Sequence, residues 1–399
     1  CRTGQPRPDP QAPRLYAYKG TTDAHVSTPR RSSRARRGAP HEDPMNPAVT
    51  PPVSDVGDVL VLGTGSWGTA LACVLCQNHA RVTLWGRDAA QVQAINDERE
   101  NRRYLPGLKL PDPLFATSDL AAAVAGLRDD PQRPPLLVVV VPTHTIRGVL
   151  GAVAAALPPS TIVVSASKGI ENDSLLTMDE VLRQVLPEPL LPRVAALSGP
   201  SFARETAEGQ PTAVLIAARD IEVARTAQRA FQAAETGTFR VYTSDDIVGA
   251  EIGGAVKNVI AIACGVAEGL GFGANTRAAL VTRGLAEIAR LGARLGANPL
   301  TFLGLAGLGD LVLTCNGSQS RNRTVGLLLG RGMTLAEALA HMNQVAEGVR
   351  TTRSVHDLAQ KLGVEMPISQ AIFRVLYEDR PVRQIMSDLL GRPPKHELG

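Results

Sequence analysis

The chain has 399 residues, enough for two or three domains with sizeable cores, and a net charge of +4. Residues 1–44 hold nine Lys/Arg against four Asp/Glu, so the remaining residues carry a net charge of −1. A nearly neutral folded part argues against nucleic acid or a membrane surface as the partner. The sequence contains no run of about 18 apolar residues, so we expect no membrane-spanning helix and no membrane insertion.

The five cysteines are scattered along the chain, which is typical of reduced thiols in a cytoplasmic protein. Cys73 and Cys76 form a C-x-x-C inside a helical pattern, where we expect small core residues rather than a redox pair. The seven histidines show no metal-ligand spacing, and the N-terminus lacks a secretion signal. We therefore predict a cytoplasmic protein without a metal site.

Residues 1–55 are rich in Pro, Arg, Ser and Thr and show no hydrophobic period, so we predict a disordered basic arm. Two interpretations of this arm remain open. It is either translated upstream sequence without a role, which the position of Met45 favours, or a targeting arm, to which the Arg-rich run Arg30–Arg37 is suited.

Residues 56–242 alternate short runs of β formers with helical patterns. We therefore predict an α/β fold with a doubly wound Rossmann-type parallel sheet, followed by an all-α C-terminal domain at residues 243–390 and a tail at 391–399. Ligands of such sheets bind at the carboxyl ends of the strands. The predicted strands are Val59–Leu62, Arg81–Trp85, Leu136–Val141, Thr161–Ser165, Arg193–Leu197 and Thr212–Ile216, and the predicted helices between them include Trp67–Asn78, Ala89–Asn96, Leu120–Gly126 and Ser174–Leu186.

The first predicted strand ends in a G-x-G-x-x-G turn, and a helical pattern follows at once. Gly63 allows the tight turn, Gly65 lets a pyrophosphate approach the backbone, and Gly68 lets the helix pack closely on the strand. The N–H groups at the start of the helix then face the phosphates. The turn in this context predicts a dinucleotide site for NADP(H) or NAD(H).

Four further strand ends carry candidate ligand contacts. Arg87 stands where an NAD-selective site usually has an acidic residue, which favours a 2′-phosphate and hence NADP without excluding NAD. His144 is either a general base or a solvated loop residue, and we favour the second. Lys168 is expected to hold a phosphate or a polarised carbonyl. The turn Ser198–Ala203 offers N–H groups to a substrate or a cofactor amide.

The stretch 246–269 is a helical pattern that is apolar almost all round and must therefore be buried. It nevertheless carries Lys257 and Asn258 in its middle, and a buried lysine is costly unless it is paired or used. Gly253 and Gly254, one turn earlier, leave room for another backbone or a ligand. Lys257 is therefore the leading catalytic candidate, against the alternatives of a lysine that reaches the surface or forms a structural ion pair.

Two polar segments follow this helix. Asp310 lies among Gly and Leu residues, where it either pairs with Lys257 and tunes the pKa of that lysine or accepts a substrate hydroxyl. Ser320 and Asn322 are helix-capping residue types before the predicted helix Val325–Leu329. Arg321 adds a planar bidentate fork, so this segment is either a phosphate site or a capped surface helix with solvated arginines.

Several blocks together resemble one known family, the NAD(P)-dependent sn-glycerol-3-phosphate dehydrogenases of the bacterial type. The blocks are Gly63–Gly68, Ser198–Ala203, Glu251–Asn258, Gly307–Cys315 and Gln319–Arg323, and the resemblance runs from about Val56 to about Leu390. It implies the reversible reduction of dihydroxyacetone phosphate by NAD(P)H to sn-glycerol 3-phosphate, a precursor of phospholipids. Residues 1–55 have no counterpart in the family.

The resemblance also implies roles for individual residues. Lys257 would be the proton acceptor in oxidation and the proton donor in reduction. Lys168 and Arg321 would lie near both cofactor and substrate. The implied cofactor contacts are Ser66, Trp67, Arg87, Ala203, Val345 and Glu347, and the implied substrate contacts are Gly199, Ser201, Asn258, Asp310, Thr314, Ser320 and Asn322.

Three alternatives remain beside this interpretation. The first is a dehydrogenase of similar architecture that acts on a β-hydroxy acid, for which the Ser320–Arg323 phosphate site would have no use. The second is a nucleotide-sensing protein that binds the cofactor without turnover and needs no buried lysine. The third is nucleic-acid binding through the basic arm. We expect a homodimer by default.

Overall fold

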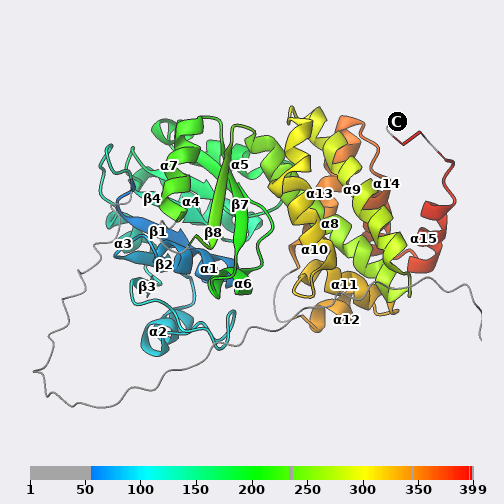
Figure 1. Ribbon diagram of the computed structural model, residues 1–399, viewed down its shortest axis with the longest axis horizontal. Helices are drawn as coiled ribbons and strands as arrows, with labels where there is room; N and C mark the ends of the chain where they lie inside the picture. Colours follow the sequence, from blue (N-terminus) through cyan, green and yellow to red (C-terminus); the bar gives the residue numbers. More distant parts are fainter. Residues whose placement is uncertain (1–54, 233–236, 343–345, 395, 398–399) are drawn as a thin grey trace, which may run out of the picture. The chain divides into compact units, whose positions relative to one another are not determined.

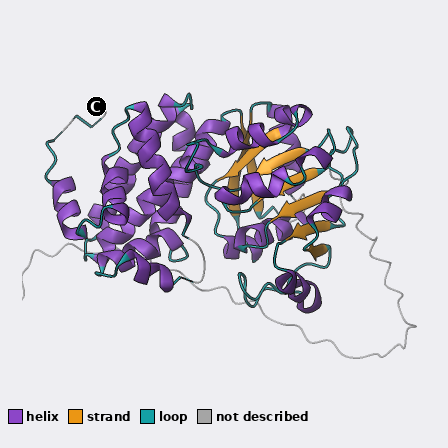
Figure 2. Cartoon of the chain, turned by 180° about the vertical axis from the view of Figure 1, so that it is seen from behind, coloured by secondary structure: helices purple, strands orange, loops and turns teal. Residues whose placement is uncertain are grey.

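The computed structural model describes residues 55–232, 237–342, 346–394 and 396–397. The predicted arm, apart from Asp55, lies outside these residues, and so does Val345. The first half of the described chain forms an eight-stranded sheet with helices on both faces, and the second half is helical (Figures 1 and 2). The doubly wound sheet followed by helices is the predicted fold class.

The strand order of the sheet is β3-β2-β1-β4-β5-β6-β7-β8. Val59 of β1 pairs in parallel with Val82 of β2 on one side and with Leu136 of β4 on the other. All neighbouring strands are parallel except β6 and β7. The strands are β1 Val59–Leu62, β2 Val82–Trp85, β3 Leu114–Thr117, β4 Leu136–Val139, β5 Ile162–Ser165, β6 Val194–Ser198, β7 Thr212–Ala218 and β8 Phe239–Ser244.

Two details of the sheet differ from the prediction. The six predicted strands are present with ends shifted by at most two residues, but β3 and β8 were not predicted. A wholly parallel sheet was also expected, whereas β7 runs antiparallel to β6. The connection between them holds a helix of five residues, α6 (Ala203–Ala207), which is about 8 Å long and too short to carry the chain back along the sheet.

Successive residues of β1 belong to two separate cores. Val59 and Val61 pack into the core on one face of the sheet, and Leu60 and Leu62 pack into the core on the other. This alternation explains why the strand is apolar at every position. The helices of this half are α1 Ser66–Leu75, α2 Ala89–Glu98, α3 Leu120–Ala125, α4 Ile146–Gly151, α5 Met178–Val185, α6 and α7 Ile221–Phe231.

The ends of some predicted helices were wrong. Helix α1 ends at Leu75 rather than Asn78, and α5 begins at Met178 rather than Ser174. The later start of α5 has a clear cause, because Thr177 and Glu180 form a capping box that fixes the first turn. The predicted helix Val325–Leu329 begins earlier, at Arg321, directly after Ser320.

The helical half is built around α8, Ile247–Gly269, which is buried as predicted. By length and composition α8 would be able to cross a membrane, but 94% of its most apolar window is buried inside the protein. Glycines let α11 approach it closely, because a Cβ on Gly265 would lie 2.0 Å from the carbonyl oxygen of Arg323. The other helices are α9 Ala274–Arg294, α10 Asp310–Asn316, α11 Arg321–Gly330, α12 Leu335–Ala340, α13 Glu347–Leu362, α14 Pro367–Tyr377 and α15 Val382–Leu390.

Candidate active site

The turn between β1 and α1 has the geometry that a dinucleotide requires. Gly63 has a φ of +124°, and a Cβ on Gly68 would lie 1.9 Å from the carbonyl oxygen of Gly63. A Cβ on Gly65 would meet no atom within 4 Å, so the backbone is open on the side where a pyrophosphate would approach. Trp67, one residue beyond Ser66, has a buried indole Nε1 without a hydrogen-bond partner in the described part of the chain. These features fit a bound dinucleotide.

Arg87 is exposed at the end of β2. The neighbouring Asp88 accepts a hydrogen bond from the N–H of Gln91 at the start of α2, and it lies 3.7 Å from Arg103. Asp88 therefore has partners other than Arg87 among the described residues. His144, in the turn after β4, is exposed like Arg87, as a solvated loop residue would be.

The centre of the site is a buried carboxylate between two lysines. Lys257 of α8 donates from Nζ to Asp310 Oδ1 at 2.5 Å and to Thr314 Oγ1 at 2.8 Å. Lys168, after β5, donates from Nζ to Asp310 Oδ2 at 2.7 Å and to the carbonyl oxygen of Gly199 at 3.3 Å. Lys257 is 7% exposed and Asp310 is 1% exposed. Pairing with Lys257 was one of the two alternatives that the sequence left open for Asp310, and the structure shows this pairing.

The electrostatics of this cluster suit proton transfer near neutral pH. Burial lowers the pKa of Lys257 to about 8, and Lys168 lowers it too, while Asp310 raises it. Burial raises the pKa of Asp310, but the two lysines outweigh this effect and hold its pKa below the usual value. Asp310 is therefore a carboxylate, and Lys257 is an ammonium that gives up its proton more readily than an ordinary lysine.

Two glycines of α8 let the cluster assemble. A Cβ on Gly253 would lie 2.4 Å from the carbonyl oxygen of Ala306, and a Cβ on Gly254 would lie 2.8 Å from Ser198 Oγ. Ala306 belongs to a π-helical turn, Leu305–Gly309, that leads directly into Asp310. The predicted room beside Lys257 is thus filled by another backbone, which brings Asp310 to the lysine.

Asn258 and Asn322 link α8, α11 and α13 beside the cluster. Asn322 donates from Nδ2 to Asn258 Oδ1 at 2.8 Å, and its Oδ1 accepts from the N–H of Gly348 at 3.0 Å. Ser320 caps α11 by accepting from the N–H of Arg323 at 3.3 Å, as its residue type predicted. Arg323 itself pairs with Glu268 at 2.7 Å.

Glu347 connects the start of α13 to the same cluster. Burial raises the pKa of Glu347, while Arg321, Lys168 and Lys257 lower it, so these three cations lie within electrostatic range of its carboxyl group. The structure thus brings together residues from β5, β6, α8, α10, α11 and α13. Of the other predicted contacts, Ser201 donates to the carbonyl oxygen of Gly199 at 3.1 Å, and Ala203 begins α6.

Two side chains near the site were not singled out by the sequence analysis, although Ser198 belongs to the predicted turn Ser198–Ala203. Ser198 ends β6, and its buried Oγ has no hydrogen-bond partner in the described residues. Arg350, in the first turn of α13, acts electrostatically on His144. An unpartnered hydroxyl is a property of the packing, and Arg350 follows Glu347 in an ordinary helical pattern, so neither side chain had a sequence signal of its own.

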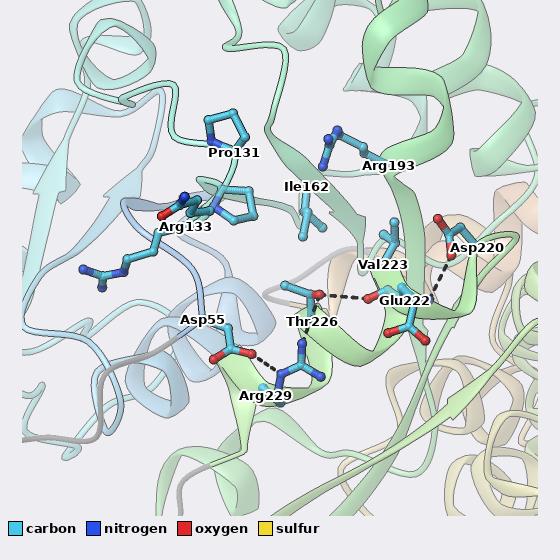
Figure 3. A pocket seen from close by; sticks show the side chains of 12 residues that line it. Asp55, Pro131, Arg133, Ile162, Arg193, Asp220, Glu222, Val223, Thr226 and Arg229 are labelled. Carbon is cyan, nitrogen blue, oxygen red and sulfur yellow. Dashed lines mark hydrogen bonds and ion pairs between the residues drawn. The ribbon is translucent and has the colours of Figure 1, made fainter.

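A cavity of about 390 Å³ lies elsewhere, among residues that include Asp55, Arg193 and Arg229. Figure 3 shows these side chains around it, with the ion pair between Asp55 and Arg229 as a dashed line. Ile162, the first residue of β5, also lines the cavity, so it lies at the amino ends of the strands. Doubly wound sheets bind ligands at the carboxyl ends, so this cavity is not the active site.

The four cysteines in the described part of the chain, Cys73, Cys76, Cys264 and Cys315, are free thiols. Within the same part of the chain, no group of three or more His, Cys, Asp or Glu residues is arranged to hold a metal ion.

The dinucleotide turn, the doubly wound sheet and the buried lysine within a helical second half define the class of NAD(P)-dependent dehydrogenases. Comparisons with known sequences give the family. The family profile described as NAD-dependent glycerol-3-phosphate dehydrogenase N-terminus matches residues 58–224, and the corresponding C-terminus profile matches residues 246–387. The chain belongs to the NAD-dependent glycerol-3-phosphate dehydrogenase family.

The names of individual relatives agree with this family. Two curated relatives bear the name glycerol-3-phosphate dehydrogenase (NAD(P)+). The relative from Syntrophobacter fumaroxidans is 50% identical over 86% of this chain and 98% of its own length, and the one from Anaeromyxobacter dehalogenans is 54% identical over 85% and 99%. The crystal structure of glycerol-3-phosphate dehydrogenase from Coxiella burnetii is 39% identical, with a TM-score of 0.78 over 84% of this chain and 99% of that one.

Proposed function

We propose that this chain interconverts dihydroxyacetone phosphate and sn-glycerol 3-phosphate with NADP(H) or NAD(H) as the redox partner. The observation that carries the proposal is the buried carboxylate of Asp310, which is hydrogen-bonded to both Lys257 and Lys168 at the carboxyl ends of the strands. The names of the relatives, which are about half identical over nearly their whole length, support the same reaction.

The dinucleotide would lie on the turn Gly63–Gly68, where the N–H groups at the start of α1 meet the pyrophosphate. When bound there, the cofactor would supply the hydride for the ketone carbon in reduction and would accept it in oxidation. The residues that we propose to contact the cofactor are Gly63, Gly65, Ser66, Trp67, Gly68, Arg87, Lys168, Ala203, Arg321, Val345 and Glu347.

The substrate phosphate would bind at the start of α11. The N–H groups of this helix terminus and the guanidinium of Arg321 form an anion site, and Asn322 is fixed by its bonds to Asn258 and Gly348. Holding the phosphate there fixes the carbonyl group relative to Lys257. The residues that we propose to contact the substrate are Lys168, Gly199, Ser201, Lys257, Asn258, Asp310, Thr314, Ser320, Arg321 and Asn322.

Lys257 would supply the proton in reduction. As negative charge develops on the carbonyl oxygen, Nζ donates a proton to it, and in oxidation the neutral amine takes the proton back. Asp310 and Thr314 hold Nζ in place, so the proton leaves from a fixed position. The pKa of about 8 keeps both protonation states accessible near neutral pH.

A substrate panel tests the reaction. Oxidation of NADPH or NADH is followed by the absorbance of the reduced nicotinamide, with dihydroxyacetone phosphate, unphosphorylated dihydroxyacetone or a β-keto acid as the acceptor. We expect turnover that depends on the phosphorylated ketone. Turnover with the β-keto acid instead would support the β-hydroxy-acid alternative, and cofactor binding without any turnover would support the nucleotide-sensing alternative.

We also propose that the protein works as a homodimer in the cytoplasm and that its product supplies phospholipid synthesis. Exposed leucines on one short segment support self-association, because Leu300 is 71% and Leu303 is 63% exposed. The free thiols support a reducing compartment. Light scattering of the purified protein tests the dimer, and fractionation of cells tests the location. Loss of phospholipid synthesis on depletion of the protein, restored by added glycerol 3-phosphate, tests the supply role.

A further inference from the structure

The C-x-x-C of the chain lies at the end of α1 that is remote from the dinucleotide turn, and the proposed reaction does not use it. Cys73 is 6% exposed and belongs to a core of the sheet half, as predicted, whereas Cys76 is partly exposed and forms the C-cap of α1. Residues three apart on a helix are neighbours on its surface. The two free thiols therefore lie on the same side of α1.

Cys73 and Cys76 both line one cavity of about 130 Å³. This cavity, which we call the thiol cavity, lies between the end of α1, the end of α6 and the segment that precedes β3. Its other walls include Lys109, Pro111 and Thr206, and its lining holds no carboxylate and no histidine among the described residues. A volume on the order of 10–15 Å³ is enough for one water molecule, so the thiol cavity has room for an ion.

The guanidinium of Arg99 lies beside the two thiols. Arg99 is the C-cap of α2, and its Nη1 donates to the carbonyl oxygen of Leu114 at 2.8 Å while its Nη2 donates to that of Pro111, a wall of the thiol cavity. Its Nε is buried and has no hydrogen-bond partner among the described residues. Burial raises the pKa of each thiol to about 12, and Arg99 acts in the opposite direction on both pKa values.

These features select one class of ligand. The thiolate is the nucleophilic form of cysteine, so a pair that is protonated at neutral pH is poorly suited to thiol–disulfide exchange. Sulfur ligands favour soft cations, and a monovalent d10 cation such as Cu(I) is satisfied by two of them. A structural zinc ion needs four ligands, and no third His, Cys, Asp or Glu in the described part of the chain joins this pair.

We propose that Cys73 and Cys76 bind one soft monovalent cation of the Cu(I) class between their sulfur atoms. Two S–H bonds break, two metal–sulfur bonds form, both protons pass to solvent, and no electron is transferred. Two thiolates and one monovalent cation carry a net charge of −1, which the guanidinium of Arg99 offsets. The buried Nε of Arg99 supplies the hydrogen-bond donor for one of the thiolates.

The test is competition for Cu(I) in the presence of a reductant, with the coloured bicinchoninate complex of Cu(I) as the probe and the full chain as the competitor. We expect the wild type to withdraw one equivalent of Cu(I) from the complex. Cys76→Ser should weaken this binding at least about a hundredfold, because the second ligand no longer acts at high effective concentration. Arg99→Gln should weaken it about tenfold, as loss of a group that supports a metal ligand does.

Cys264→Ala is the matched control, because Cys264 is a free thiol in the separate core around α8 and is 1% exposed. This variant should bind Cu(I) like the wild type. Cys1 is present in every variant, so its contribution cancels in the comparison. Three results would overturn the inference: a wild type that withdraws no Cu(I), a Cys76→Ser variant that withdraws as much as the wild type, and an equal loss of binding in Cys264→Ala.

A second measurement leaves the chain unchanged. Bound Cu(I) should slow the alkylation of the partly exposed Cys76, with the modified residue located by peptide mass spectrometry. An alkylation rate at Cys76 that Cu(I) does not change would also overturn the inference. Neither readout depends on turnover, so failure of the proposed reaction and failure of this inference remain distinguishable.

Discussion

Gly253 of α8 lies so close to Ala306 that a Cβ would come within 2.4 Å of the Ala306 carbonyl oxygen. This close approach packs the π-helical turn Leu305–Gly309 against α8 and places Asp310 beside Lys257. We expect Gly253→Ala to lower both stability and activity, because a methyl group on rigid backbone forces the two segments apart. The stability loss should be about 1–3 kcal/mol, measured by chemical denaturation.

Gly148→Ala serves as the comparison for this variant. Gly148 also lies in a helix, α4, but a Cβ there would meet no atom within 4 Å. That variant should keep full activity and stability. Equal behaviour of the two alanine variants would show that the close approach at Gly253 is not required.

The pH dependence of the reaction should follow Lys257. Reduction needs the protonated amine, so kcat/KM for dihydroxyacetone phosphate should be level at low pH and fall as pH rises through about 8. Oxidation needs the neutral amine and should rise over the same range. Rates measured in both directions between about pH 6 and pH 10 would show two mirrored curves.

The variant Asp310→Asn tests whether Lys257 is the group that titrates, because Asp310 raises the pKa of Lys257. Without the carboxylate, the midpoint of both curves should move to lower pH. A midpoint that stays in place or moves upward would mean that another group controls the titration.

Arg321 and Arg323 lie two residues apart on α11 but should behave differently. Arg321→Gln should raise the KM for dihydroxyacetone phosphate about tenfold or more, because a charge-assisted hydrogen bond to the phosphate is lost. Arg323 is paired with Glu268, so Arg323→Gln should leave the KM nearly unchanged. Steady-state kinetics on both variants checks this, and an unchanged KM in Arg321→Gln would remove the phosphate-binding role.

Glu251 should make the protein less stable as pH rises. Burial raises the pKa of Glu251 to about 8 even though the carboxyl group accepts from the N–H of Asp179. Because the folded state holds the proton more tightly than the unfolded state, the destabilisation begins near the unfolded pKa and is complete above about pH 8. Glu251→Gln should remove this loss and be more stable than the wild type at high pH by several kcal/mol, because each unit of pKa difference corresponds to about 1.4 kcal/mol. Parallel stability curves for the two proteins between about pH 5 and pH 9 would contradict this expectation.

The sequence indicated most of the fold because buried parallel strands leave continuous apolar runs. Strands β1, β4 and β5 are of this kind, and each is fully buried. Strand β8, at the edge of the sheet, has alternating buried and exposed residues at its start. Only every second residue there is buried, so β8 has no continuous apolar run. Strand β3 has four residues and directly follows Pro113, and its signal was too short to detect.

The chemistry of the site was predictable where one residue type conflicts with its surroundings. A lysine within an apolar helix and a carboxylate among glycines indicated Lys257 and Asp310, and the structure confirms that they meet. The second bond of Asp310, to Lys168, joins residues 142 positions apart in the sequence. The position of Arg350 near His144 depends in the same way on how α13 packs, so no local pattern predicted it.

Initial rates of NADPH oxidation with dihydroxyacetone phosphate, measured for the wild type and Lys257→Met side by side, test the role of Lys257 most directly. If Lys257 donates the proton, the variant should lose roughly 10²- to 10⁴-fold in kcat while its NADPH affinity changes less than about twofold. A folded Lys257→Met variant with near wild-type turnover would contradict the role of Lys257 as the proton donor.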